Sequence, residues 1–288
     1  MKTRIIYEDQ HILVCYKPAG LATQTARVGQ QDMVSELKNY LAGKARQQSI
    51  QPERQKNAQK AGEKKAAAKN AAAKNAAAKK SGQPYLGVIH RLDQPVEGLL
   101  VFAKDSASAA KLTAQLSQGT LNKQYYAAVC GRPPAESAEL VDYLTKDDDS
   151  GSAVVVNGQG AVKGSENANT PKKAVLQYHI MGKAVAEPKQ GDPGAQYLST
   201  QEHITMLDIH IDTGRFHQIR AQMAHAGLPL LGDSRYGNEI SIQFSRSLQV
   251  RNVALCAYKI VLKHPVTGKQ MEFSVKPEGK IFSNFSII

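Results

Sequence analysis

The chain has 288 residues, of which 42% are apolar, and a formal net charge of +12 at pH 7. This length suits one large or two small domains, and the apolar content is typical of a folded protein with a core. The charged start Met1–Glu8 and the absence of a long apolar run argue against a signal peptide and a membrane span, so we expect a cytoplasmic protein. Cys15, Cys130 and Cys256 lie far apart without Cys-x-x-Cys spacing, which predicts neither a disulfide framework nor a zinc knuckle.

The first elements are predicted to be two strands and a helix. The strands cover residues 5–7 and 12–16, and the second ends at the turn Lys17-Pro18-Ala19-Gly20. Asp32 is placed to cap a helix, whose apolar face at 3.6-residue spacing contains Met33, Leu37, Tyr40 and Leu41.

Residues 46–82 interrupt this pattern with a Lys/Ala-rich segment. Ten Lys or Arg and two Glu lie between Arg46 and Lys80, a net charge of +8 that leaves only +4 for the rest of the chain. Three pentads over residues 66–80 place their lysines around a helix without an apolar stripe. We interpret the segment as an exposed, partly helical or disordered insertion. It is either a spacer or a cationic arm that binds RNA phosphates.

The stretch 88–104 holds the first chemical signal. Two apolar runs suited to buried strands flank a polar turn that contains His90-Arg91-Leu92-Asp93, Pro95 and Gly98. A carboxylate on such a loop can act as a nucleophile or as an acid or base, and an arginine two residues away can reach a phosphate. A structural ion pair between Arg91 and Asp93 is the alternative.

The middle of the chain predicts one helix and a series of strands. Asp105 or Ser106 is placed to cap a helix through about Leu116. Residues 121–131 alternate as a strand, so Tyr125 and Tyr126 should point to opposite faces of a sheet. Further strands are predicted at residues 140–144, 153–156, 174–180 and 204–211, with surface loops at 157–173 and 182–196.

The last signal combines a glycine turn with a predicted helix, in Thr213-Gly214-Arg215-Phe216-His217-Gln218-Ile219-Arg220. His225-Ala226-Gly227 and Gly232-Asp233-Ser234-Arg235-Tyr236-Gly237 follow. His217 and His225 have no Cys, His or acidic neighbour at metal-ligand spacing, so no metal site is expected. A strand at Leu255-Cys256-Ala257, a turn at 264–268 and a final strand at about 270–276 complete the prediction.

These motifs, in this order, resemble those of the RluA-type pseudouridine synthases. The matching segments are Lys17-Pro18-Ala19-Gly20, His90-Arg91-Leu92-Asp93, Lys123-x-Tyr125-x-Ala127-x-Val129-x-Gly131, and Gly214-Arg215-x-His217-Gln218-Ile219-Arg220 with the Gly232–Gly237 continuation. The resemblance covers most of the chain except residues 46–82 and the middle loops. Family members with an N-terminal S4 RNA-binding domain carry it before the first motif, where this sequence leaves no room, so a stand-alone catalytic domain is expected.

The resemblance implies an isomerase that breaks the glycosidic bond of a flipped-out uridine and rejoins the base through carbon. Asp93 would be the essential aspartate, as nucleophile or base, and Arg220 would keep it ionised. Ile219 would lie below the uracil, and Tyr125 would stack on it or hydrogen-bond to it. Arg91 would fill the space left by the flipped base or bind a phosphate.

Some residues depart from the family pattern. Val96-Glu97 replaces the usual Thr-Ser, which adds a carboxylate near Asp93 if Glu97 faces inward, and Phe216 replaces a small polar residue. Ala221-Gln222 replaces Val-His. An RNA-binding paralogue with weak or lost catalysis is therefore the second hypothesis. A phosphotransferase reading of His90–Asp93 fails, because no glycine-rich phosphate loop precedes the motif and no Asp-Phe-Gly follows it.

The expected fold is a single α+β domain over residues 1–288. Its mixed, mostly antiparallel sheet is flanked by helices and holds Asp93, Tyr125 and Arg220 in one cleft. Asp93 and Arg220 are predicted to lie within ion-pair reach. The predicted partner is RNA, either ribosomal or transfer, for a monomer without cofactor, metal or membrane.

Overall fold

The computed structural model describes residues 1–25, 29–60, 84–156, 170–185 and 203–285. Its helices are α1 Met33–Lys60, α2 Ser106–Ser117, α3 Gln218–His225, α4 Glu239–Ser247 and the 3₁₀ helix η2 Lys280–Asn284. Its strands are β1 Arg4–Glu8, β2 Ile12–Lys17, β3 Gly87–Val88, β4 Glu97–Ala103, β5 Asn122–Cys130, β6 Ser137–Asp147, β7 Ser152–Val156, β8 Lys172–Val185, β9 His203–Ile211, β10 Leu255–Lys263 and β11 Gln270–Ser274.

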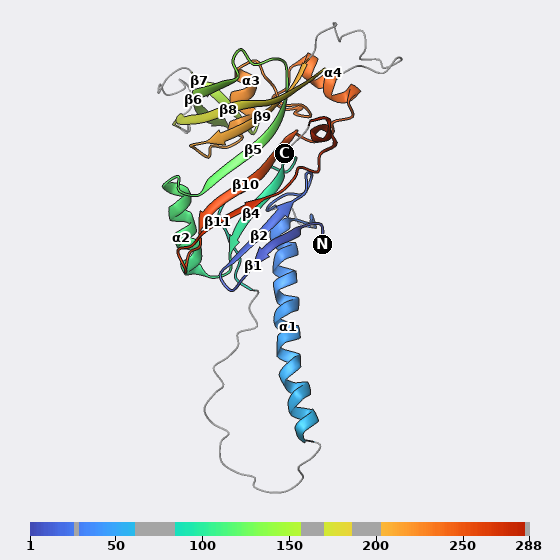
Figure 1. Ribbon diagram of the computed structural model, residues 1–288, viewed down its shortest axis with the longest axis vertical. Helices are drawn as coiled ribbons and strands as arrows, with labels where there is room; N and C mark the ends of the chain where they lie inside the picture. The colour runs from blue at the N-terminus through green and yellow to red at the C-terminus, as the bar shows by residue number, and fades with distance from the viewer. Residues whose placement is uncertain (26–28, 61–83, 157–169, 186–202, 286–288) are drawn as a thin grey trace.

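The strands of the described residues form one sheet in the order β1-β2-β4-β10-β5-β9-β8-β6-β7, with β3 paired to β4 and β11 to β10. Among the pairs formed by these described strands, only β4–β10 is parallel. The prediction of a mixed, mostly antiparallel sheet flanked by helices is therefore confirmed (Figure 1).

The two faces of the sheet carry separate apolar clusters. On one face, the first turns of α1 and the buried side of α3 pack with Tyr125 of β5. On the other face, α2 and β11 cover one part, and η2 and α4 cover another part that includes Tyr126. Tyr125 and Tyr126 thus lie on opposite faces, as strand alternation predicts. This alternation puts Tyr125 on the same face as α3.

Helix α1 begins as expected and continues into the first part of the segment 46–82. Asp32 accepts a hydrogen bond from the Ser35 backbone N–H at 2.7 Å, and Met33 and Leu37 are fully buried. The helix runs to Lys60, away from the sheet, which agrees with a partly helical segment 46–82 (Figure 1). Gln, Arg, Lys and Glu make up most of residues 46–60 and favour helix, whereas Pro52 within this stretch removes one backbone N–H donor. Residues 61–82 of the predicted insertion lie outside the described residues.

Several strand boundaries and two helices differ from the prediction. The strands expected at 140–144 and 255–257 extend to Ser137–Asp147 and Leu255–Lys263. Strand β8 extends over residues 172–185, so the ends of both expected loops, at 172–173 and 182–185, belong to the sheet. Residues 157–169 and 186–196 of these loops lie outside the described residues. Residues 170–171 are described and precede β8. Helices α4 and η2 were not expected. The Asn238 side chain caps α4 by accepting from the Ser241 N–H.

The sheet register brings the loop after β3 close to β5. Gly98 of β4 pairs with Ala257 of β10, which pairs with Tyr125. Gly98 has φ 126°, and a Cβ there would lie 2.5 Å from the backbone N and O of Ala257. Only glycine allows this close approach of β4 and β10. The residues just before Gly98, including Asp93, are therefore held beside Tyr125.

Candidate active site

Asp93 lies on a loop that the turn after β2 holds in place. The buried ammonium of Lys17 donates hydrogen bonds to the carbonyl oxygens of Leu21, at 2.7 Å, and Gln94, at 3.1 Å. The Gly20 N–H donates to the same Gln94 carbonyl at 2.8 Å. Burial lowers the pKa of Lys17 to about 7, although the charge of Asp93 opposes this shift. The Lys-Pro-Ala-Gly motif thus fixes the backbone next to Asp93.

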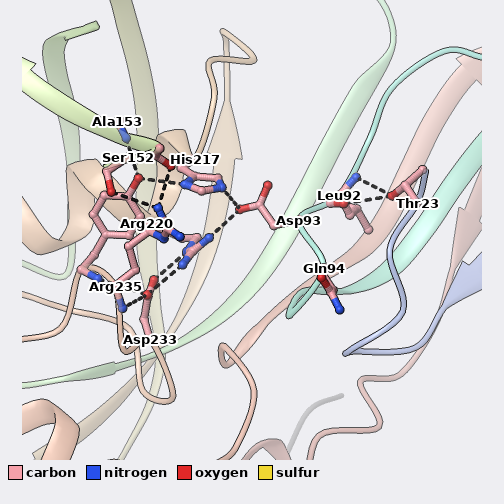
Figure 2. Close-up of polar contacts among 12 residues, drawn as sticks. Thr23, Leu92, Asp93, Gln94, Ser152, Ala153, His217, Arg220, Asp233 and Arg235 are labelled. Atoms are coloured by element: carbon pink, nitrogen blue, oxygen red, sulfur yellow. Dashed lines mark hydrogen bonds and ion pairs between the residues drawn. The ribbon is translucent and has the colours of Figure 1, made fainter. Parts of the chain in front are cut away.

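The residue before Asp93 is fixed as well. The Thr23 hydroxyl donates to the Leu92 carbonyl at 2.9 Å, and the Leu92 N–H donates back to Thr23 Oγ1 at 3.3 Å (Figure 2). Arg91 is exposed and makes no hydrogen bond or ion pair with the described residues. Its side chain is therefore available to a ligand, while hydrogen bonds hold the loop beneath it.

Arg220 joins two carboxylates that are far apart in the sequence. Its Nη1 lies 3.0 Å from Asp93 Oδ2, across 127 residues of chain, which confirms the predicted ion pair. Its Nε and Nη2 donate to Asp233 Oδ2 and Oδ1 at 2.7 and 2.9 Å (Figure 2). The bidentate geometry orients the guanidinium, so Asp233 determines where the third donor of Arg220 meets Asp93.

Exposure changes along this chain of charges. The side chain of Asp233 is 1% exposed, that of Arg220 6% and that of Asp93 26%. Burial disfavours the charged guanidinium, but the hydrogen bonds and charges of Asp233 and Asp93 raise the pKa of Arg220. The site thus presents a carboxylate to solvent at the end of a buried, permanently paired cation.

His217 is a second neighbour of Asp93. Its Nε2 lies 3.5 Å from Asp93 Oδ2, and its Nδ1 lies 2.8 Å from the Tyr236 hydroxyl. This hydroxyl also accepts from the Ala153 N–H at 2.7 Å (Figure 2). The carboxylate of Asp93 can only accept a hydrogen bond, so it favours a donor at Nε2 of His217 and leaves Nδ1 to accept from the Tyr236 hydroxyl. The proton of neutral His217 therefore sits on Nε2 and faces Asp93.

The environment of His217 favours the neutral ring. Burial lowers the pKa of His217 to about 4, although Asp93 pulls it upward. The residue also adopts a left-handed backbone with φ 51°, which is uncommon for a non-glycine residue and sets the direction of its ring.

This shift predicts an acid-sensitive fold. Because the unfolded chain binds a proton on residue 217 below about pH 6.5 and the folded chain does so only near pH 4, unfolding free energy should fall as the pH drops through this range. The slope for one histidine is at most about 1.4 kcal/mol per pH unit. His217→Asn, which tolerates the left-handed backbone, should reduce this slope in denaturant titrations at pH 7, 6, 5 and 4.5. An equally steep slope in the variant would contradict the assignment.

Tyr125 and Ile219 come together with this site. Both are 5% exposed and belong to the same apolar cluster. Burial, followed by the charge of Asp93, raises the pKa of the Tyr125 phenol. Asp93 and Arg220 are thus in direct contact, Tyr125 and Ile219 share one apolar cluster, and exposed Arg91 lies two residues from Asp93.

The departures from the family pattern have structural explanations. Glu97 is buried and accepts from the backbone N–H groups of Glu278, at 3.1 Å, and Gly279, at 3.0 Å, as well as from the Tyr16 hydroxyl. Its carboxylate holds the C-terminal segment and is not available to repel RNA. Gln222 is also fully buried and donates to Asp142 Oδ2 at 2.8 Å.

Asp233, His217 and Tyr236 were not assigned to the site from the sequence. The signal was present, because all three lie in the last two motifs, but neither spacing nor residue type indicated that they converge on Asp93. Among the described residues, no three His, Cys, Asp or Glu side chains form a group that could bind a metal. No helix among them is long and apolar enough to cross a bilayer.

Comparison with known sequences agrees with this geometry. The sequence model of the RNA pseudouridylate synthase family matches residues 11–225, which contain Asp93, Tyr125 and Arg220. The chain therefore belongs to the RNA pseudouridylate synthase family.

Similar curated proteins include three named ribosomal large subunit pseudouridine synthase D. The protein of Zymomonas mobilis subsp. mobilis is 26% identical over 94% of this chain and 68% of its own length. The protein of Pseudomonas aeruginosa is 29% identical over 95% of this chain and 68% of its length. That of Haemophilus influenzae is 28% identical over 66% of this chain and 52% of its length. The chain thus spans between about half and two thirds of these relatives.

Solved structures show the same fold. Human RNA Pseudouridylate Synthase Domain Containing 1 superposes with a TM-score of 0.61 at 15% identity, covering 96% of this chain and 83% of that one. Human RNA Pseudouridylate Synthase Domain Containing 4 gives 0.59 at 18% identity, covering 98% and 90%. At these identities the likeness concerns the fold.

Proposed function

We propose that this chain is an RNA pseudouridine synthase that isomerises specific uridines of large-subunit ribosomal RNA. The observation that carries the proposal is the carboxylate of Asp93 held 3.0 Å from Arg220, whose other donors are occupied by buried Asp233. Three of the similar proteins are named for the large ribosomal subunit, which favours ribosomal over transfer RNA. We further propose that the enzyme works in the cytoplasm, as a monomer without cofactor or metal.

The reaction neither adds nor removes atoms. The bond between N1 of uracil and C1′ of ribose breaks, the base turns, and a bond from C5 to C1′ replaces it. C5 loses its proton to solvent, and N1 takes up one proton in its place. Charge that develops on sugar or base is met by Asp93, which acts as nucleophile or base. Arg220 orients this carboxylate, Ile219 lies below the uracil and Tyr125 contacts its ring. Arg91 occupies the vacated position in the RNA or binds its phosphate.

The test is a map of pseudouridines in ribosomal and transfer RNA from a strain that lacks the gene. We expect loss of one or a few sites in large-subunit RNA, restored when purified protein acts on the unmodified RNA. If the deletion strain lost no pseudouridine, and the purified protein bound the unmodified RNA without converting any uridine, the non-catalytic paralogue would be favoured. Loss of sites only in transfer RNA would overturn the choice of substrate.

Substitutions of Tyr125 separate its ring from its hydroxyl. If stacking on the uracil is its role, Tyr125→Phe should retain most of the activity, whereas Tyr125→Leu should lose at least about tenfold, since base–aromatic stacking contributes roughly 1–3 kcal/mol. Single-turnover rates with saturating enzyme measure both variants. A phenylalanine variant slower than the leucine variant would refute the stacking role.

We propose that residues 46–82 are a spacer within one domain of residues 1–288. Their deletion, with the ends joined, should leave the melting temperature and the rate at saturating RNA unchanged, because Asp93, Tyr125 and Arg220 lie outside them. RNA affinity should change by less than about threefold, and the slope of log affinity against log salt should be unchanged. A weaker affinity with a flatter slope would instead identify a phosphate-binding arm, and unfolding would contradict both readings.

A further inference from the structure

Phe216 is an exposed aromatic ring beside the candidate active site. It is 41% exposed, and within the described part of the chain Tyr85 is the other aromatic among the exposed large hydrophobic residues. Single exposed apolar residues are common in soluble proteins. This one differs because of what lies on either side of it: the glycine turn of the last motif precedes it, and the Asp93 neighbour His217 follows it.

The ring of Phe216 is supported on one side. It stacks on the imidazole of His217, with ring centroids 3.8 Å apart and an interplanar angle of 21°. His217 is itself fixed by the Tyr236 hydroxyl and by its left-handed backbone at φ 51°. The two rings therefore form a pre-organised platform, which loses little conformational entropy when a ligand binds.

The surroundings of this platform suit a nucleotide. Lys146 Nζ lies 6.0 Å from the Phe216 ring centroid and also pairs with the exposed carboxylate of Asp148. An exposed pair of this kind is weak, so a phosphate attached to a stacked base can replace Asp148 as the partner of Lys146. Exposed aromatic rings next to cations are how proteins bind unpaired bases, because every base offers a flat π-face. An apolar peptide side chain would gain nothing from the lysine.

The position of the platform limits which base it can take. Phe216 contacts His217, and His217 Nε2 lies 3.5 Å from Asp93 Oδ2, so the platform begins one side chain away from the reacting group. The target uracil needs the interior position between Tyr125 and Ile219, both of which are buried. A base on the exposed Phe216 ring is therefore a neighbour of the target in the RNA chain.

We propose that Phe216, backed by His217, is a stacking platform for an unpaired nucleobase adjacent to the target uridine. The proposal rests on RNA being the substrate, as inferred above. It names a recognition element that belongs to this chain, since the resembling family usually has a small polar residue at this position.

The chain contains no tryptophan, so Phe216→Trp introduces a single fluorescent indole at the platform. Tyr85→Trp, at an exposed aromatic position 49% accessible, is the matched control. Each is combined with Asp93→Asn so that binding is observed without turnover. The probe is a 12-nucleotide single-stranded RNA with one uridine flanked by adenines, and the same RNA with an abasic site on either side.

We expect the adenine-flanked RNA to quench the indole at position 216 and not the one at position 85. One of the two abasic RNAs should abolish most of the quenching. Equal quenching at both positions, or no dependence on the flanking bases, would overturn the proposal.

Affinity gives a second, independent measurement. Phe216→Leu should weaken binding of the adenine-flanked RNA by between about five- and 100-fold, and Phe216→Tyr should restore it, since stacking contributes roughly 1–3 kcal/mol per base. The leucine variant should bind the sensitive abasic RNA as well as the unsubstituted protein does. A leucine variant that melts normally and binds all RNAs like wild type would reject the platform. Because these are binding measurements, the platform and the synthase activity can each fail without the other.

Discussion

Asp93→Asn should abolish pseudouridine formation, with a loss of at least about a thousandfold, and leave the fold intact. The substitution removes the charge that meets the developing charge on sugar or base, an electrostatic contribution of several kcal/mol in enzymes of many kinds. The asparagine side chain has nearly the same shape as the aspartate that it replaces. Arg220 keeps its bidentate pair with Asp233, at 2.7 and 2.9 Å, so no buried cation is left without a partner. The measurement is the release of tritium from RNA that contains 5-tritiated uridine.

The control is Asp149→Asn, which removes a carboxylate from an exposed turn. It should leave turnover, RNA affinity and melting temperature unchanged. Asp93→Asn should match it in affinity, within about threefold, and in melting temperature. Loss of fold and of binding together in the Asp93 variant would make Asp93 a structural residue of the loop, and turnover at the wild-type rate would remove it from the chemistry.

The ion pair between Asp93 and Arg220 could be predicted from the sequence because each residue belongs to a motif that matches a known family. Local patterns also predicted the alternation of β5 and the Asp32 and Asp105 caps, because each depends on a few neighbouring residues. For the strand and for both caps, the residues that determine the local structure lie within one helical turn or one strand.

Other features depend on contacts that no local pattern contains. Glu97 looked like a possible second carboxylate near Asp93, but its direction depends on the C-terminal segment, whose N–H groups at Glu278 and Gly279 bind it. Likewise, the hydroxyl that meets Nδ1 of His217 comes from Tyr236, and the same hydroxyl binds a β7 backbone N–H at Ala153. These contacts follow from tertiary packing rather than from spacing in the sequence.

Removal of Asp233 should have the largest effect on stability in this site. Arg220 is 6% exposed and Asp233 1% exposed, so Asp233→Ala leaves a buried guanidinium with Asp93 as its remaining carboxylate. Breaking a buried ion pair by deleting one partner costs about 3–5 kcal/mol, because the other charge stays desolvated. We expect a loss of this size in urea unfolding at pH 7, together with a strong loss of turnover, since Arg220 would no longer be held at 3.0 Å from Asp93.

A double variant separates the two effects. Arg220→Met with Asp233→Leu removes both charges and fills the space with apolar side chains, a change that is often neutral or stabilising in other proteins. Its unfolding free energy should therefore exceed that of Asp233→Ala by about 2 kcal/mol or more, while pseudouridine formation stays at the level of Asp93→Asn. If the double variant recovered turnover along with stability, the Arg220–Asp93 pair would have no part in the reaction. If Asp233→Ala were as stable as wild type, the guanidinium would not depend on Asp233 for its position, and the directed contact to Asp93 would need another cause.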